Sequence, residues 1–128
     1  MELLTHKEID STISGKLVEL DNNRAIVKLE TKEFMRADSR GLVHGGFTFS
    51  AADFAAMAAV NSENVVLVSA NVSFLAPVVV GDEVIFKAEV IEKNGKKSKV
   101  QVVGYVKEKE VFKGEFFTYS PSSHILDR

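Results

Sequence analysis

The segment of residues 47–61 limits what this chain can fold into more than any other feature. It contains six alanines and one methionine with no proline and no glycine, and alanine and methionine favour helix. Apolar side chains occur almost all round this helix, which is typical of a buried helix rather than a surface one. Such a helix needs cover on most of its surface, and a curved β-sheet wrapped around it would supply that cover.

The chain after this helix has the pattern of consecutive β-strands. Apolar and polar residues alternate over residues 83–92 and again over 99–106, and Asn94-Gly95 between them is a strong hairpin signal. Further strands are predicted over residues 65–75 and 111–119. A run of strands with one segregated helix predicts an α+β fold with a mostly antiparallel sheet.

Two shorter elements are predicted before the long helix. Thr5 begins the pattern of a capping box, so we expect a short helix from there to about Ile13, ending at Gly15. Residues 16–20 and 25–29 are rich in β-forming residues around an Asx-rich turn, which predicts a hairpin.

Length and composition bound the domain organisation and the classes of function. The 128 residues are expected to form one domain over residues 1–128, with a poorly ordered tail over about 121–128. A net charge of −2 argues against a nucleic-acid binder. The chain has no cysteine, and no histidine and carboxylate cluster has metal-ligand spacing, so we expect neither disulfides nor a metal site. Because no apolar span or secretory signal is present, we expect a cytoplasmic protein that does not bind membranes.

Asp53 is the only acidic residue between Val43 and Val60, and apolar residues surround it. A carboxylate in such a setting is unfavourable unless it is paired or hydrogen-bonded, and burial raises its pKa. One interpretation is structural: a bond to a neighbouring hydroxyl or backbone amide, or a place at a subunit interface. The other is functional: a general base or nucleophile on one face of the helix.

His44-Gly45-Gly46 stands directly before the helix. The two glycines allow the backbone to approach a ligand closely, and the first helical N–H groups lie at the positive end of the helix dipole. A phosphate, a carboxylate or a developing oxyanion fits such a place. A tight turn that leads into a helix is the other interpretation of the same residues.

The wider motif connects these two features. The HGG sequence, an acid nine residues after its histidine, a helix of small residues, and Phe74-Leu75-Ala76-Pro77 followed by Gly81-Asp82 occur together in this chain. The combination resembles the hotdog-fold thioesterases, specifically the PaaI-like branch, which hydrolyses acyl-CoA thioesters. The resemblance covers about residues 38–90 by motif, and the order of elements is compatible over nearly the whole chain.

The resemblance implies a fold, a mechanism and an assembly. In that family a long helix lies in a wrapped antiparallel sheet, and two subunits pair to form the site. Asp53 would be the general base or nucleophile, the Gly45 amide would polarise the thioester carbonyl with Gly46 adjacent, and His44 would hold the turn and assist at the carbonyl. A homodimer is implied, with a dimer of dimers as a further possibility, and no cofactor except coenzyme A as part of the substrate or ligand.

Some positions depart from the family pattern. Asp38 stands where many relatives have Asn or Gln, and Met57 stands where some have Thr. A polar side chain on the strand that follows the helix would come from Ser69, Asn71 or Ser73, whose alternate spacing places all three on one face. The substrate-contact candidates are therefore Gly46, Asp38, Met57, Asn61, Ser69 and Asn71, with Arg40, Lys96 and Lys97 as candidates for the phosphates of coenzyme A.

The expected function is hydrolysis of a small or medium acyl-CoA. The alternative is a non-hydrolytic, regulatory acyl-CoA-binding protein that keeps the pocket, and the residues at positions 38 and 57 motivate it. A dehydratase-type relative on the same fold is a third interpretation, although such enzymes usually pair a histidine and an acid differently.

Overall fold

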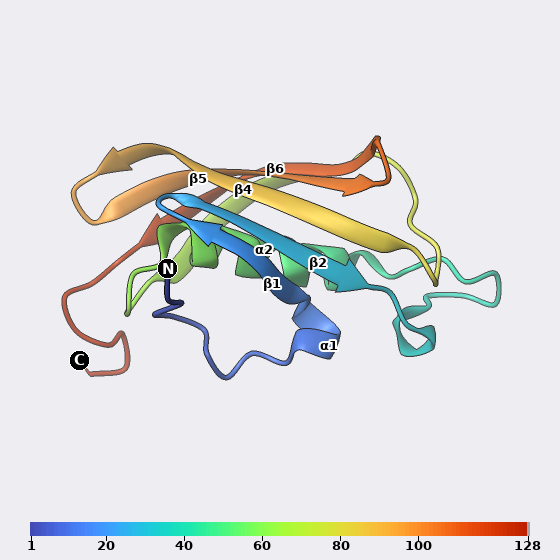
Figure 1. Cartoon of the computed structure of the whole chain (residues 1–128), viewed down its shortest axis with the longest axis horizontal. Coiled ribbons are helices and arrows are strands. Elements are labelled where there is room, and N and C mark those ends of the chain that lie inside the picture. The colour runs from blue at the N-terminus through green and yellow to red at the C-terminus, as the bar shows by residue number, and fades with distance from the viewer. Residues whose placement is uncertain (128) are drawn as a thin grey trace.

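The computed structural model describes residues 1–127, and Arg128, the last residue of the predicted poorly ordered tail, lies outside the described residues. Figure 1 shows one long helix that lies against a curved sheet. The elements in chain order are α1 (Ser11–Ser14), β1 (Lys16–Asp21), β2 (Arg24–Glu30), the 3-10 helix η1 (Glu33–Met35), α2 (Gly45–Val60), β3 (Val66–Phe74), β4 (Glu83–Asn94), β5 (Lys97–Val106) and β6 (Lys109–Tyr119).

Six strands form one antiparallel sheet in the order β1-β2-β4-β5-β6-β3. The predicted hairpins, β1–β2 and β4–β5, pair neighbours in the sequence. The chain that leaves α2 instead reaches the far edge of the sheet, where β3 pairs with the last strand, β6. Because α2 packs on β2, β4 and β5 in the middle of the sheet, the predicted α+β architecture of one helix wrapped by strands is confirmed.

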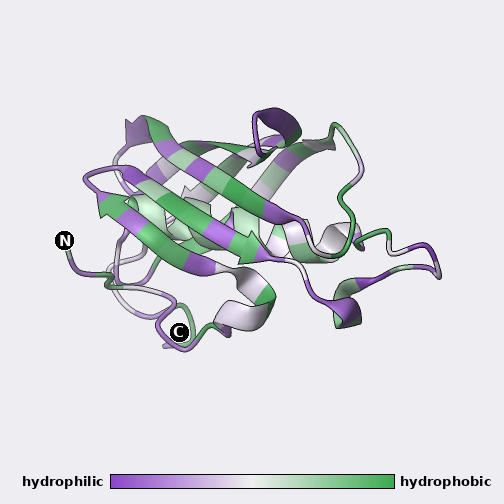
Figure 2. Ribbon diagram, turned by 45° about the vertical axis from the view of Figure 1, so that its right-hand side comes forward, coloured by the Kyte–Doolittle hydropathy of each residue, from purple (hydrophilic) through white to green (hydrophobic). Residues whose placement is uncertain are grey.

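The core lies between α2 and the inner face of the sheet. Alternate residues of the central strands, among them Val27, Phe86, Val102 and Phe116, are fully buried. Figure 2 shows the resulting alternation of hydrophobic and hydrophilic residues along the strands. All six alanines of α2 are buried, and their small side chains allow the strands to lie close to the helix axis.

The long helix begins two residues earlier than predicted, at Gly45 rather than Phe47. His44 takes the extended conformation of an N-cap residue, and both glycines after it are helical. At the other end Asn61 adopts a left-handed conformation with φ of 50°, and its N–H donates to the Met57 carbonyl. Neither this helix nor any other among residues 1–127 is long and apolar enough to cross a membrane.

The first helix differs more from its prediction. Asp10, not Thr5, is its N-cap, because the Asp10 carboxylate accepts the N–H of Thr12 at 2.9 Å. The capping-box interpretation of Thr5 is therefore wrong, since its hydroxyl pairs with Nδ1 of the His6 ring instead. The helix does end at Gly15, which has a φ of 83° that favours glycine.

The strand β3 lies at one edge of the sheet and leaves one of its sides without a partner strand. Its nine residues include no charge and no proline, two of the features that commonly protect a sheet edge from pairing with another chain, and its register with β6 shifts once, between Leu67 and Ser69. Val68 is 65 % exposed on this strand and Phe74 is 55 % exposed. The edge is therefore suited to pairing with a strand from a second chain.

Candidate active site

Asp53 lies on α2, within two turns of the helix C-terminus, and is only partly exposed. Among residues 1–127, its Oδ1 is the one buried side-chain oxygen or nitrogen that has no hydrogen-bond partner. Burial raises the pKa of Asp53 to about 6. The nearby Ser50 hydroxyl does not satisfy this carboxylate, because it pairs with the Ser14 hydroxyl at 2.6 Å. An unsatisfied, partly desolvated carboxylate is common at functional sites and rare elsewhere.

The Asp53 side chain opens into a cavity of about 400 Å³ between the N-terminal segment, α2, β3 and the C-terminal tail. Its walls are partly polar and partly aliphatic. They are formed by Thr5, His6, Asp53, Glu63, Asn64, Val65, Val66, Leu67, His124 and Ile125. Sequence reasoning did not connect His6 or His124 with Asp53, because both lie near the chain ends and no local pattern links them to the helix.

Asn61 fixes the N-terminal segment that forms one wall of this cavity. The Leu4 N–H donates to Oδ1 of Asn61 at 2.7 Å, and Nδ2 of Asn61 donates to the Glu2 carbonyl at 2.9 Å. The residue that ends the helix therefore also holds residues 2–4 across the helix end. Its side chain is occupied by these bonds, so the structure gives the predicted substrate-contact residue a scaffolding position.

Replacing Asn61 tests the clamp that its side chain forms through the two hydrogen bonds to Glu2 and Leu4. We expect Asn61→Gly to destabilise the protein by about 1–2 kcal/mol through loss of both side-chain bonds, since glycine accepts the left-handed backbone. Asn61→Ala adds backbone strain and should be about 1 kcal/mol worse. Denaturant unfolding gives the two free energies, and hydrogen exchange at Leu4 should quicken in both variants. An unchanged exchange rate at Leu4 would contradict the clamp.

The HGG sequence forms the turn into α2. No side chain caps the first helical turn, so its leading N–H groups keep their capacity to bind a ligand at the positive end of the helix dipole. A Cβ added at Gly45 would lie 3.1 Å from the Phe74 ring, and one at Gly46 would lie 3.1 Å from the His44 ring. The His44 ring is exposed and packs edge-to-face near Phe47. Glycine at these two positions therefore keeps space open at the helix N-terminus.

Gly45 borders a second hollow, separate from the Asp53 cavity. This hollow measures about 370 Å³. It is lined by Leu42, Val43, Gly45, Thr48, Phe74, Leu75, Ala76, Pro77, Val78 and Val111. Gly45 and Asp53 are eight residues apart on one helix, which corresponds to about 12 Å along the helix axis at a rise of about 1.5 Å per residue. One chain therefore does not bring these two predicted groups to the same reacting atom.

Asp38 and Met57, the two departures from the family pattern, both make contacts that stabilise the fold. Oδ1 of Asp38 accepts the N–H groups of Arg40 and Leu42 at 3.0 and 3.2 Å and so organises the loop before the HGG turn. Met57 is fully buried in the core one turn after Asp53. Neither side chain lines the Asp53 cavity.

The remaining substrate-contact candidates lie on the surface, where Ser69 and Lys97 line one hollow of about 800 Å³ and the others are dispersed. Ser69 and Asn71 are exposed on the edge strand β3, outside the Asp53 cavity. Arg40 is exposed in the loop before α2, and Lys96 and Lys97 are exposed at the β4–β5 hairpin. Within one chain these residues do not converge with Asp53, and residues 1–127 contain no group of three or more carboxylates and histidines arranged to hold a metal ion.

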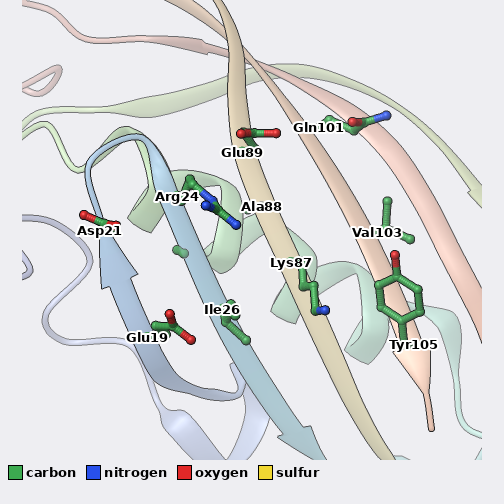
Figure 3. Close-up of a pocket in the computed structure, with 11 residues that line it drawn as sticks. Glu19, Asp21, Arg24, Ile26, Lys87, Ala88, Glu89, Gln101, Val103 and Tyr105 are labelled. Carbon is green, nitrogen blue, oxygen red and sulfur yellow. The ribbon is translucent and has the colours of Figure 1, made fainter. Parts of the chain in front are cut away.

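A further hollow of about 240 Å³ lies on the outer face of the sheet, on the opposite side from α2 (Figure 3). Acidic and basic side chains alternate across it, including Glu19, Arg24, Lys87 and Glu89. The Lys87 ammonium lies 5.4 Å from the centre of the Tyr105 ring. Charges of both signs on a shallow surface are typical of a solvated face, and none of the predicted site residues lies here.

The arrangement of a long helix in a wrapped antiparallel sheet, with an acid in the helix and an HGG turn before it, defines a hotdog-fold protein. The model of the thioesterase superfamily matches residues 40–113, which is more than half of the chain. The chain therefore belongs to the thioesterase superfamily, and the predicted resemblance and fold class are confirmed.

Individual relatives have diverse names. The chain is 57 % identical over 118 residues to methylthioribose-1-phosphate isomerase of Aquifex aeolicus, covering 92 % of this chain but only 26 % of that protein. It is 36 % identical over 117 residues to the transcription factor FapR of a Thermoanaerobacter species, covering 91 % of this chain and 58 % of that protein. The chain thus spans about a quarter of the first relative and less than two thirds of the second.

Solved structures agree on the fold. The crystal structure of an uncharacterized protein from Pyrococcus horikoshii is 46 % identical with a TM-score of 0.98, covering 99 % of this chain and 98 % of that one. The Escherichia coli PaaI protein of the phenylacetic acid degradation operon is 22 % identical with a TM-score of 0.80, covering 88 % and 83 %. A Streptococcus mutans protein bound to acetyl CoA is 18 % identical with a TM-score of 0.81, covering 92 % and 97 %. The last two likenesses concern the fold alone.

Proposed function

We propose that the protein hydrolyses small or medium acyl-CoA thioesters and acts as a homodimer. The observation that carries this proposal is the Asp53 carboxylate, whose Oδ1 is buried without a partner beside a cavity. A base with a pKa of about 6 is mostly ionised at pH 7 and is more basic than an ordinary aspartate. Membership of the thioesterase superfamily supports the same chemistry.

The proposed reaction uses Asp53 on the thioester carbonyl carbon. Asp53 either removes a proton from an attacking water or attacks the carbon itself and forms an anhydride that water then opens. In both routes the C–S bond breaks, the sulfur takes up a proton, and the products are a carboxylic acid and free coenzyme A. A Gly45 N–H at the helix N-terminus would stabilise the charge on the carbonyl oxygen.

The distance between the two groups is the reason for proposing a dimer. Since about 12 Å of helix separates Gly45 from Asp53 in one chain, a single thioester needs Gly45 of one copy and Asp53 of the other. The uncharged edge of β3 offers a surface on which two copies can pair. A dimer of two such dimers is a further proposal that would leave both sites of each pair unchanged.

The proposed ligand contacts follow from this assembly. His44 would hold the HGG turn and assist at the carbonyl, and Gly46 would keep the approach open. The exposed Arg40, Lys96 and Lys97 are proposed contacts for the phosphates of coenzyme A. We propose no resident cofactor, since coenzyme A enters as part of the substrate. Acyl-CoA esters are intracellular metabolites, so the proposal places the protein in the cytoplasm.

A second candidate function is a regulatory protein that binds acyl-CoA without hydrolysing it. The specific observation in its favour is the 36 % identity to a protein named as a transcription factor. The core position of Met57 is also consistent with it, because this side chain offers the cavity no polar helper beside Asp53. The carboxylate of Asp53 favours the enzyme over the binder, since binding alone does not need an unpaired buried acid.

A thiol-release assay separates the two candidates. We expect turnover with one or more short or medium acyl-CoA esters from a panel that spans short, long and aromatic acyl groups. Thermal stability is measured with the same esters, because binding without turnover raises the melting temperature and releases no thiol. Stabilisation without thiol release for the whole panel would contradict the thioesterase and establish the binder.

A further inference from the structure

We propose that His6 is a positioning residue of the Asp53 site, where its imidazole holds the attacking water together with the Asp53 carboxylate. This inference rests on the proposed function and adds to it a group from the N-terminal segment. His6 and Asp53 come from distant parts of the sequence and line the same cavity. Three features of the N-terminal segment suit His6 to this role: its attachment to Asn61, its backbone conformation and the state of the imidazole.

The N-terminal segment holds His6 in a defined position. Asn61 at the end of α2 binds the backbone of Glu2 and Leu4, only two residues before His6. Thr5 is almost completely buried, so the residue directly before His6 is anchored as well. His6 itself has a φ of 55°, a left-handed conformation that is unfavourable for a residue with a side chain. Such strain persists where the surroundings impose it, and it is frequent at functional sites.

The imidazole is half-buried and has one free nitrogen. Nδ1 of His6 pairs with the Thr5 hydroxyl at 2.7 Å, and Nε2 makes no hydrogen bond within residues 1–127. Burial lowers the pKa of His6, so the ring is neutral at pH 7. If Nδ1–H donates to Thr5, the Nε2 lone pair is an acceptor. Thr5 thus fixes which nitrogen is available to the cavity.

Two acceptors can orient one water molecule. In the proposed arrangement the water donates one hydrogen to Asp53 and the other to Nε2 of His6, which directs an oxygen lone pair at the carbonyl carbon. The new O–C bond forms as Asp53 takes the proton, and that proton passes to the sulfur when the C–S bond breaks. His6 ends the cycle unchanged, and a protonated His6 could not accept from the water.

The requirement for two unprotonated groups gives a kinetic signature. The charged or titratable groups that face the cavity are His6 from the N-terminal segment, Asp53 from α2, Glu63 from the loop before β3 and His124 from the tail. Below the pKa values of both Asp53 and His6, log(kcat/KM) should rise with a slope of two per pH unit. In His6→Gln the slope should fall to one, because only Asp53 still titrates.

The experiment compares parent, His6→Gln, His6→Ala and Lys7→Ala over pH 4.5–8 in the thiol-release assay. We expect about a tenfold to hundredfold lower kcat in both His6 variants with little change in KM, while the exposed Lys7→Ala control keeps the rate and the slope of the parent. Circular dichroism verifies that each variant is folded. A His6→Gln variant with the rate and slope of the parent would overturn the inference while the thioesterase proposal stands. A slope that falls to one in His124→Gln and not in His6→Gln would also overturn it.

A second measurement does not depend on turnover. The pKa of the His6 ring is followed by NMR in the parent and in Asp53→Asn. Because a nearby carboxylate favours the imidazolium, the pKa of His6 should fall further when Asp53 loses its charge. No change would show that the two groups do not meet, and would overturn the inference even if the parent hydrolyses no ester. Failure of the proposed function is separate, since it appears as an inactive parent.

Discussion

Replacing Asp53 with asparagine is expected to reduce thioester hydrolysis by about a hundredfold to ten-thousandfold in kcat, the range found when a general base is removed. The asparagine side chain has nearly the same shape, so the helix and the core should be unaffected. Parent activity should rise from pH 5 to pH 7, because the pKa of Asp53 is about 6 and the ionised form is the active one. The thiol-release assay across this range gives both results.

The same substitution should change stability in a pH-dependent way. The folded state raises the Asp53 pKa from 3.8 to about 6, so it binds this proton more tightly than the unfolded chain. The contribution of Asp53 to the free energy of unfolding of the parent is therefore greatest below pH 3.8. This contribution is lost as the pH rises to about 6. A shift of about two units corresponds to at most about 3 kcal/mol, and partial solvent access reduces it to about 1–2 kcal/mol.

Asp53→Asn removes this titration, since the amide carries no charge. The stability advantage of the variant over the parent should be near zero at pH 4 and should reach about 1–2 kcal/mol at pH 7. Denaturant unfolding of both proteins at the two pH values measures it, and all other carboxyl groups cancel in the comparison. Hydrolysis by the variant at the rate of the parent would refute the catalytic role of Asp53. A parent that is more stable than the variant at pH 7 would refute the claim that the ionised carboxylate is buried without a hydrogen-bond partner.

Charging the edge of β3 is expected to separate the two copies and to remove activity with them. Val68 is 65 % exposed in the first half of β3, and Val68→Lys places a strongly hydrated ammonium where another strand would pair. We expect a monomer by sedimentation equilibrium. If Gly45 of the other copy supplies the amide at the carbonyl oxygen, kcat/KM should also fall by about a hundredfold or more.

The opposite edge of the sheet provides the matched control. Val18 lies on β1 and is 51 % exposed, so Val18→Lys makes the same chemical change at a comparable surface. We expect it to keep the oligomeric state and the activity of the parent. A Val68→Lys monomer with full activity would show that one chain holds a complete site, and a Val18→Lys monomer would place the interface at β1.

Local sequence was sufficient to predict an element or a site residue where a short pattern of residues is compatible with only one structure. The alanine-rich run predicted α2, because small apolar residues without proline or glycine favour a helix that is covered on all sides. Asn94-Gly95 predicted the β4–β5 hairpin, since few residues accept the backbone of a tight turn. Asp53 stood out for the same reason: one carboxylate in an apolar helix is unfavourable without a function or a partner.

Competing interactions explain the two helix starts that the structure places differently from the prediction. Thr5 and Glu8 match a capping box in spacing, but Thr5 pairs with His6 and the segment is held by Asn61 instead. Glycine has a low helix propensity, so Gly45 and Gly46 were expected to lie before α2. The first turn of α2 includes both, because a side chain at either position would crowd Phe74 or His44.

The sequence by itself determined the helix, the strands, the acid in the helix and the turn before it, because each depends on residues that are neighbours along the chain. Only the tertiary structure decided what surrounds the acid. The path of the N-terminal segment brings His6 and Asp53 to the walls of one cavity, and the crossing of β3 to the far edge leaves one side of that strand unpaired. It also placed Gly45 and Asp53 too far apart to act on one carbonyl within a single chain. Those outcomes depend on contacts between residues distant in sequence, and no local pattern encodes them.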